Sequence, residues 1–247
     1  MSLALSAQSL LLSQEKAPSP QRTTSSVPFV GCRSDGQVGP MEAPKGTSIS
    51  VPISLKAARK LAYYKSEQGA GFLAPRGWYC FGTYGSGGDA LFVSPQSIKT
   101  VDIFSPGRSG LAGPAIELWR RFGETSGRFD VAEIIARVFP AYKAFATGVM
   151  AEFDQPTRSL TFGPYPNDRL IYKSKTMVEY RTPARTDGLG THSLLNKNGS
   201  PIDGVAILIG QPPDVLLLSV RLPPDLNGLT STVVLQVERE AAGRLPN

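Results

Sequence analysis

The sequence has one histidine and two cysteines among its 247 residues, so chemistry that depends on imidazole or thiolate groups has few candidates. A tetrahedral zinc site needs four ligands, usually Cys or His at short spacings, and Cys32, Cys80 and His192 do not provide such a set. Any acid–base chemistry by histidine would have to use His192. The sequence predicts no metal site and no cofactor.

Motifs of phosphate-binding loops and hydrolases are also lacking. The glycine-rich residues 82–89 have neither the Lys and Ser/Thr of a P-loop nor the GxGxxG spacing of a dinucleotide-binding turn. Tyr84 stands where the GxSxG motif has its first glycine, so Ser86 does not match a nucleophile elbow. The aromatic run 78–84 and the apolar run 90–93 predict instead a β-hairpin with a glycine turn.

Long hydrophobic runs are absent. The longest, residues 215–220, lies between Pro213 and Pro223 and is far shorter than the roughly 18 to 20 residues needed to span a bilayer. We therefore expect no transmembrane segment.

Large apolar side chains are scarce between residues 13 and 28, which are rich in Ser, Thr, Pro and Gln. Such a segment cannot bury enough surface to offset the entropy of ordering. Residues 2–12 have the small, apolar character of the later part of a signal peptide but lack its basic n-region. We expect residues 1–28 to be a disordered leader, either a truncated signal region or an ordinary leader, and residues 29–247 to form one domain.

Positive charge is in modest excess, with a net charge of +6. The densest basic group consists of Arg169, Lys173, Lys175, Arg181 and Arg185. In a strand over residues 170–181 the charged side chains would share one face, and Tyr172, Val178 and Tyr180 the other. This pattern is typical of a half-buried strand with a solvated side; the alternative is a polyanion-binding face. Because no recognised nucleic-acid-binding motif accompanies the charge, we do not expect nucleic acid as a partner.

The clearest predicted helix begins at Asp130, which with Glu133 forms a start resembling a capping box. Its apolar stripe continues past Pro140 to Phe153. Since proline removes a backbone donor and clashes with the preceding turn, we expect a kink or break near Pro140 between two helical pieces. This pair should form the central buried helical layer.

The remaining elements are predicted from periodicity and turn residues. A helix capped by Ser54 should end at Gly69, and a last helix should cover residues 229–242. Strands are expected at residues 48–53, 101–104, 116–122, 205–209 and 215–222, the last two being central strands covered on both faces. The order of elements predicts an α+β single domain with a mixed or antiparallel sheet packed against the kinked central helical pair.

Three segments carry a family resemblance: residues 29–40, residues 74–95 with APRGWYCFGTYGSGG, and residues 123–140 with TSGRFDVAEIIARVFP. Through them the chain resembles a family of uncharacterised exported bacterial proteins over residues 29–242. The resemblance implies a periplasmic or secreted location and brings no activity or catalytic residue with it.

In an exported protein, Cys32 and Cys80 would most simply form a disulfide with each other, since their number is even. The alternative is a pair of buried free thiols in a cytosolic protein.

A small-anion site is the first of two candidate binding sites. Thr125, Ser126, Gly127 and Arg128 directly precede the Asp130 helix, whose N-terminus would offer free N–H groups and positive partial charge. The alternative is that these residues only cap and turn the chain.

The second candidate is the long loop over residues 182–203, with Arg185, Asp187, Thr191 and His192, because a connection of this length often lines a functional site. The alternative is a plain solvated loop.

These observations favour a non-catalytic exported protein of the bacterial envelope that binds an envelope component or a protein partner. The alternative is a hydrolase in which His192 acts with Ser86, Ser193 or a carboxylate such as Asp187. Glu117, Glu124, Asp130 and Glu133 are further acids, but their spacing does not place any two across a substrate.

Overall fold

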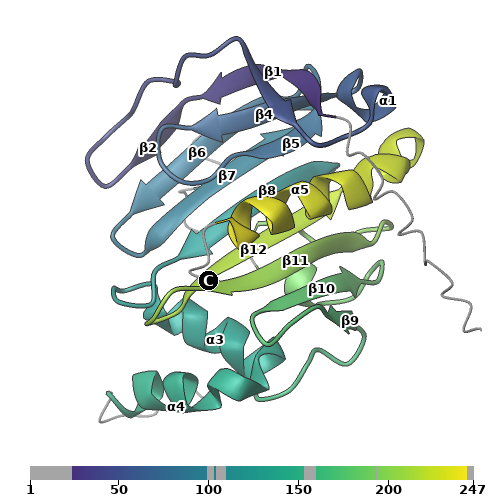
Figure 1. The fold of residues 1–247 in the computed structure, drawn as a ribbon. Helices are drawn as coiled ribbons and strands as arrows, with labels where there is room; N and C mark the ends of the chain where they lie inside the picture. The colour runs from purple at the N-terminus through teal and green to yellow at the C-terminus, as the bar shows by residue number, and fades with distance from the viewer. Residues whose placement is uncertain (1–23, 99–102, 104–109, 153–159, 193, 244–247) are drawn as a thin grey trace, which may run out of the picture.

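The computed structural model describes residues 24–98, 103, 110–152, 160–192 and 194–243. Its strands form two sheets, one of four strands in the order β3-β1-β4-β5 and one of eight in the order β2-β6-β7-β8-β12-β11-β10-β9 (Figure 1). The four-stranded sheet consists of β1 (Ser25–Cys32), β3 (Ser48–Val51), β4 (Leu61–Ser66) and β5 (Phe72–Pro75). The eight-stranded sheet consists of β2 (Ser34–Gly36), β6 (Tyr79–Gly85), β7 (Gly88–Ser94), β8 (Ala115–Arg121), β9 (Arg169–Tyr172), β10 (Met177–Thr182), β11 (Ile202–Ile209) and β12 (Asp214–Arg221).

Both sheets are mixed. Strand β1 runs parallel to β4, with Phe29 opposite Tyr63, and antiparallel to β3. In the large sheet β2 is parallel to β6, and the other pairings are antiparallel. Since β1 begins at Ser25, regular structure starts before the boundary expected at residue 29; residues 1–23 of the expected leader lie outside the described residues.

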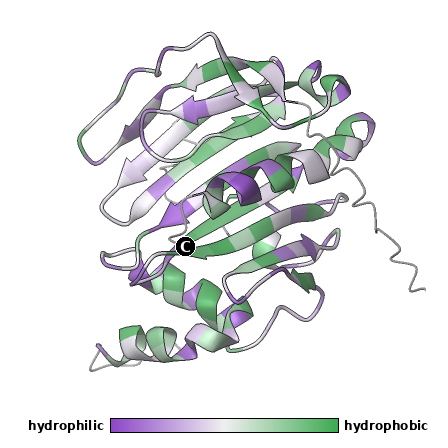
Figure 2. Ribbon diagram, viewed as in Figure 1, coloured by the Kyte–Doolittle hydropathy of each residue, from purple (hydrophilic) through white to green (hydrophobic). Residues whose placement is uncertain are grey.

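The eight-stranded sheet separates two hydrophobic clusters. On one face, the four-stranded sheet and α5 (Thr230–Ala242) pack over side chains such as Leu118, Val205 and Leu218. On the other, α3 (Arg128–Val138) and α4 (Lys143–Ala151) cover side chains that include Trp119 and Leu217. Figure 2 shows that β11 and β12 are hydrophobic along much of their length, as expected for strands covered on both faces.

The helical pair differs in part from its prediction. Helix α3 ends at Val138, a 3-10 turn η1 (Pro140–Tyr142) follows, and α4 begins at Lys143, so the helix breaks where Pro140 predicts. The pair is not the central layer, because it covers one face of the sheet. Among the residues of α4, the buried ones are Ala146 and Val149.

The start of α3 was also predicted wrongly. The helix begins at Arg128 with Gly127 as its N-cap, and no side chain caps it. Asp130 lies inside the first turn, where its carboxylate accepts a hydrogen bond from Arg121 Nε at 2.9 Å. Asp130 therefore pairs with Arg121 of β8 instead of capping the helix as predicted.

The helix predicted from Ser54 to Gly69 is mostly a strand. Ser54 does cap a helix, since its Oγ accepts from Ala57 N at 3.2 Å, but α1 covers only Leu55–Ala58. The following β4 lies between β1 and β5. Its first four residues are all buried, and such a continuous apolar run suits a central strand as well as a buried helix.

Most other elements match their predictions. The β6–β7 hairpin, β3, β8, β11, β12 and α5 are confirmed. The single strand expected over residues 170–181 is instead the hairpin of β9 and β10, and the 182–203 loop contains the 3-10 turn η2 (Leu189–Thr191). The strand expected at residues 101–104 lies outside the described residues except for Ile103, which is helical and buried.

Candidate functional site

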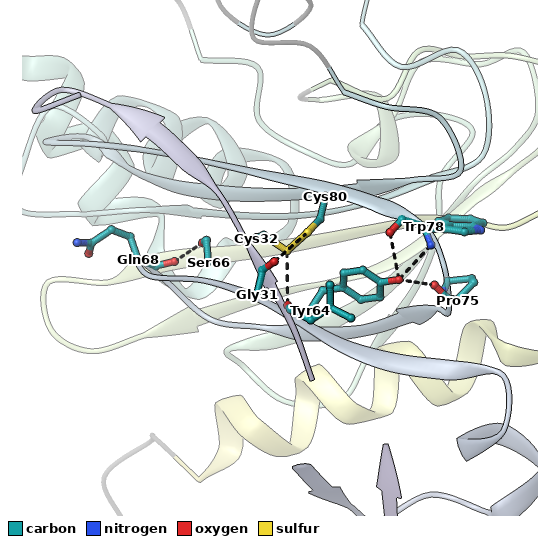
Figure 3. The surroundings of a disulfide bond; sticks show 9 residues. Gly31, Cys32, Tyr64, Ser66, Gln68, Pro75, Trp78 and Cys80 are labelled. Atoms are coloured by element: carbon teal, nitrogen blue, oxygen red, sulfur yellow. Dashed lines mark hydrogen bonds between the residues drawn. A yellow bond between two sulfur atoms is a disulfide. The ribbon is translucent and has the colours of Figure 1, made fainter. Parts of the chain in front are cut away.

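A disulfide joins Cys32 to Cys80, with an S–S distance of 2.06 Å, as expected. Cys32 ends β1 and Cys80 lies in β6, so the bond ties the small sheet to the large one (Figure 3). Beside it, the fully buried Tyr64 donates from Oη to the carbonyl oxygen of Pro75 at 2.7 Å and accepts from Trp78 N at 3.2 Å. Tyr64 on β4 thus holds the backbone of Trp78, directly before β6, close to the small sheet.

The expected anion segment lies where the two glycine-rich motifs meet. Phe122 N donates to Gly87 O at 3.1 Å, and a Cβ at Gly127 would lie 2.0 Å from that same oxygen, so no larger residue fits there. Ser86 Oγ and Ser126 Oγ lie 3.4 Å apart. Both serines are exposed at this contact between two turns.

Arg128 is already paired. Its Nη2 lies 2.8 Å from Glu152 Oε2, its Nη1 donates to Thr125 O at 3.0 Å, and its guanidinium stacks over Phe129 at 4.6 Å from the ring centroid. An anion at this helix start would have to compete with the Glu152 carboxylate.

His192 packs at the end of η2. Its ring lies edge-on to Trp119, with centroids 5.4 Å apart. Burial lowers the pKa of His192, with a weaker opposing effect from Asp130. The Asp130 carboxylate is hydrogen-bonded to Arg121 and does not orient the His192 ring. His192 therefore makes a structural contact with Trp119 and, among the described residues, lacks the carboxylate partner of a catalytic base.

The other residues of the 182–203 loop do not converge on His192. Asp187 forms an exposed ion pair with Lys197, with 2.7 Å between Oδ2 and Nζ. Thr191 Oγ1 accepts from Gly188 N at 3.0 Å, which closes the turn of η2. Glu117 is buried and accepts from Leu194 N at 3.2 Å, while Ser193 lies outside the described residues.

A cavity of about 760 Å³ lies on the α5 side of the large sheet, a volume typical of small-molecule sites. Its walls come from the β9–β10 hairpin, from the start of α5 and from the 3-10 turn η3 (Pro224–Leu229). Helix α5 packs over β11 and β12, so the outer strands β9 and β10 extend past it and leave this pocket open.

The pocket combines apolar and charged side chains. Ile171 and Leu235 line it from β9 and α5 and remain 60% and 37% exposed. Of its basic residues, Arg181 makes two hydrogen bonds to Asp203, at 2.8 and 2.9 Å, and Lys173 pairs with Glu179 at 2.8 Å. Arg169 has no ion pair among the residues that the structure describes, so one positive charge in the lining is left uncompensated.

A carboxyl pair lies at the same site. Glu179 on β10 lines the pocket, and Glu238 on α5 is 7% exposed. Burial, together with a hydrogen bond and charge repulsion from Glu179, raises the pKa of Glu238 to about 7, against a smaller opposing effect of Lys173.

Sequence reasoning did not find this pocket or this pair. It did identify Arg169, Lys173 and Arg181 as the densest basic group, but as the solvated side of a strand. A signal for Glu238 was present, because a glutamate occupies a position between Val234, Val237 and Ala241, which are buried on α5. Glu238 and Glu179 are distant in sequence, so their contact could not be read from spacing.

Comparison with known proteins yields no match: no family model, no curated protein and no solved structure is similar to this chain. Within the described residues, no helix has both the length and the apolar character needed to cross a membrane.

Proposed function

We propose that this chain is an exported, non-catalytic protein of the bacterial envelope, and that it binds an amphipathic small molecule with an anionic group in the pocket between the β9–β10 hairpin and α5. The observation that carries the proposal is the exposed apolar surface of Ile171 and Leu235 next to the uncompensated charge of Arg169. An apolar body with one anionic end complements both features.

The disulfide supports a periplasmic or secreted location. Disulfides form and persist in oxidising compartments and are rare in the cytosol. The Cys32–Cys80 bond joins the two sheets, so its formation is part of the fold.

A binding role fits the pocket better than the hydrolase alternative does. The pocket contains the hydroxyl groups of Ser200, Thr230 and Ser231. The one histidine of the sequence, His192, packs against Trp119, which belongs to the cluster on the opposite face of the sheet. It therefore cannot act as a base for a nucleophile in the pocket.

Fluorescence titration with 8-anilinonaphthalene-1-sulfonate tests the binding site, since this probe combines an aromatic body with a permanent negative charge. We expect Ile171→Asp and Arg169→Glu each to weaken binding about tenfold, the loss of roughly 1.4 kcal/mol. Val38→Asp is the matched control, because Val38 is 77% exposed outside the pocket, and it should bind like the parent protein. Equal affinity of all four proteins would contradict the proposal.

A screen with ester, glycoside and peptide substrates tests the alternative. Turnover that is abolished by His192→Ala would replace the binding role with a hydrolase.

A further inference from the structure

Glu238 places a buried acid on the pocket side of α5. Ser231, Val234 and Leu235 of this helix line the pocket, and Glu238 follows Leu235 by three residues and Val234 by four. Positions three and four apart share a helix face, so Glu238 extends the same face by one turn. Glu238 does not itself line the pocket, but its carboxyl group interacts with that of Glu179, which does.

The Oε1 atom of Glu238 is buried and has no hydrogen-bond partner among the described residues. The neighbouring carboxyl of Glu179 can offer it no donor if both groups are ionised. A single proton shared by the two carboxyl groups removes the repulsion between them. Lys173, at 2.8 Å from Glu179 Oε1, then balances the one remaining negative charge.

The other charged groups near Glu238 have partners of their own, and the charge of Arg239 opposes the raised pKa of Glu238 less than that of Lys173 does. Arg239, its neighbour on α5, donates to the Pro52 carbonyl at 2.7 Å. Strand β5, which packs against α5, carries no charged residue, and on β11 Asp203 is bound to Arg181.

On the remaining elements that contact α5, Asp214 and Arg221 are the charged residues of β12. Asp214 accepts from Gly123 N at 3.0 Å and Arg221 donates to Gly113 O at 2.8 Å. Asp225 belongs to η3. The pair and Lys173 therefore set the charge at this end of the pocket.

We infer that Glu179 and Glu238 share one proton and that its loss adds a negative charge beside the pocket, so that affinity for anionic ligands falls as the pH rises through neutrality. The inference rests on the proposed function, because it concerns the regulation of the same site. The direction follows from Coulomb repulsion between the new carboxylate and an anionic ligand.

The test is the same probe, 8-anilinonaphthalene-1-sulfonate, titrated between pH 5.5 and pH 8.5, a range over which its sulfonate stays ionised. We expect the parent protein to bind the probe about three- to tenfold more weakly at the upper end, the scale of one added charge in a partly solvated site. Glu238→Gln keeps a hydrogen-bond donor for Glu179 but cannot ionise, and it should bind tightly at both ends. Glu42→Gln removes the same charge from an exposed position and should behave like the parent protein.

The two proposals fail differently. Pocket variants that weaken the probe while the parent protein binds it equally at both pH values would overturn the proton-sharing inference and leave the binding site standing. A parent protein whose pH dependence persists in Glu238→Gln would also overturn it. Unchanged affinity for the probe in both Ile171→Asp and Arg169→Glu would overturn the proposed function and, with it, this inference.

Discussion

Lys173 and Glu179 face each other across the β9–β10 hairpin, with 2.8 Å between Nζ and Oε1. This ion pair holds the Glu179 carboxyl at the rim of the pocket and next to Glu238 of α5. The hairpin thereby presents to α5 a carboxyl group that is partly neutralised, which allows a second acid to be buried beside it.

Replacement of Glu238 by glutamine should stabilise the protein at pH 8 and have no effect at pH 4. Burial raises the pKa of Glu238 to about 7, above its value in the unfolded chain, so the folded state keeps a proton that the unfolded state loses. The protonated Glu238 therefore contributes its full stability below the pKa that it has in the unfolded chain, and this contribution is lost as the pH rises towards 7. Allowing for solvent screening, we expect Glu238→Gln to raise the free energy of unfolding at pH 8 by about 1 kcal/mol, or the melting temperature by roughly 2–4 °C.

Thermal melts of both proteins across this pH range measure the difference. His192, whose pKa is lowered, titrates in both proteins and does not affect the comparison. A difference that stays constant with pH would show that Glu238 titrates normally.

Replacement of both cysteines by alanine should cost about 4 kcal/mol, because Cys32 and Cys80 are 48 residues apart and the bond restricts a loop of that length in the unfolded chain. Urea unfolding of the double variant and of the oxidised parent gives the value. Reduction of the parent protein should reproduce the loss, and a parent that keeps its midpoint after complete reduction would contradict the prediction.

Replacement of Arg221 by leucine should destabilise the protein by about 3 kcal/mol or more. Arg221 is 2% exposed as a residue, and its guanidinium donates to the carbonyl oxygens of Leu111, Gly113 and Asn196, which would lose these donors. Arg33→Leu is the matched control, because its pair with Glu42 is exposed, and should change stability by less than about 1 kcal/mol. Equal urea midpoints for the two variants would be evidence against a structural role for Arg221.

Replacement of Arg128 by alanine should lower stability by about 0.5–1 kcal/mol, since the pair with Glu152 is partly exposed. Thermal melts with and without sulfate measure both effects. Because Glu152 already holds the guanidinium, we expect sulfate to shift parent and variant equally. A sulfate shift seen only in the parent would restore Thr125–Arg128 as an anion site.

Local sequence patterns were sufficient to predict those elements whose intrinsic turn, strand or helix-breaking signals agree with the structure that they adopt in the fold. Glycines in the β6–β7 hairpin, and the aromatic and β-branched residues of β6, β7, β11 and β12, give turn and strand signals that do not depend on packing partners. Pro140 breaks the helix wherever that helix packs, because its missing N–H is a property of the residue. The even number of cysteines, with the expectation of export, predicted the Cys32–Cys80 disulfide that the structure contains.

Tertiary packing determined the elements and side-chain roles that local patterns predicted wrongly. The apolar run at Leu61 fits a helix or a central strand, and its place between β1 and β5 selected the strand. The role of Asp130 passed from a cap to a partner of Arg121 because β8 lies beside α3.

By itself, the sequence determined that an α+β domain forms, where its helix breaks, and which two cysteines are present to join. The tertiary structure alone decided that the β9–β10 hairpin extends past α5 and that Glu179 meets Glu238 there. The physical reason is that charge and burial act through space: two acids distant along the chain acquire a shared environment only once a strand and a helix pack together.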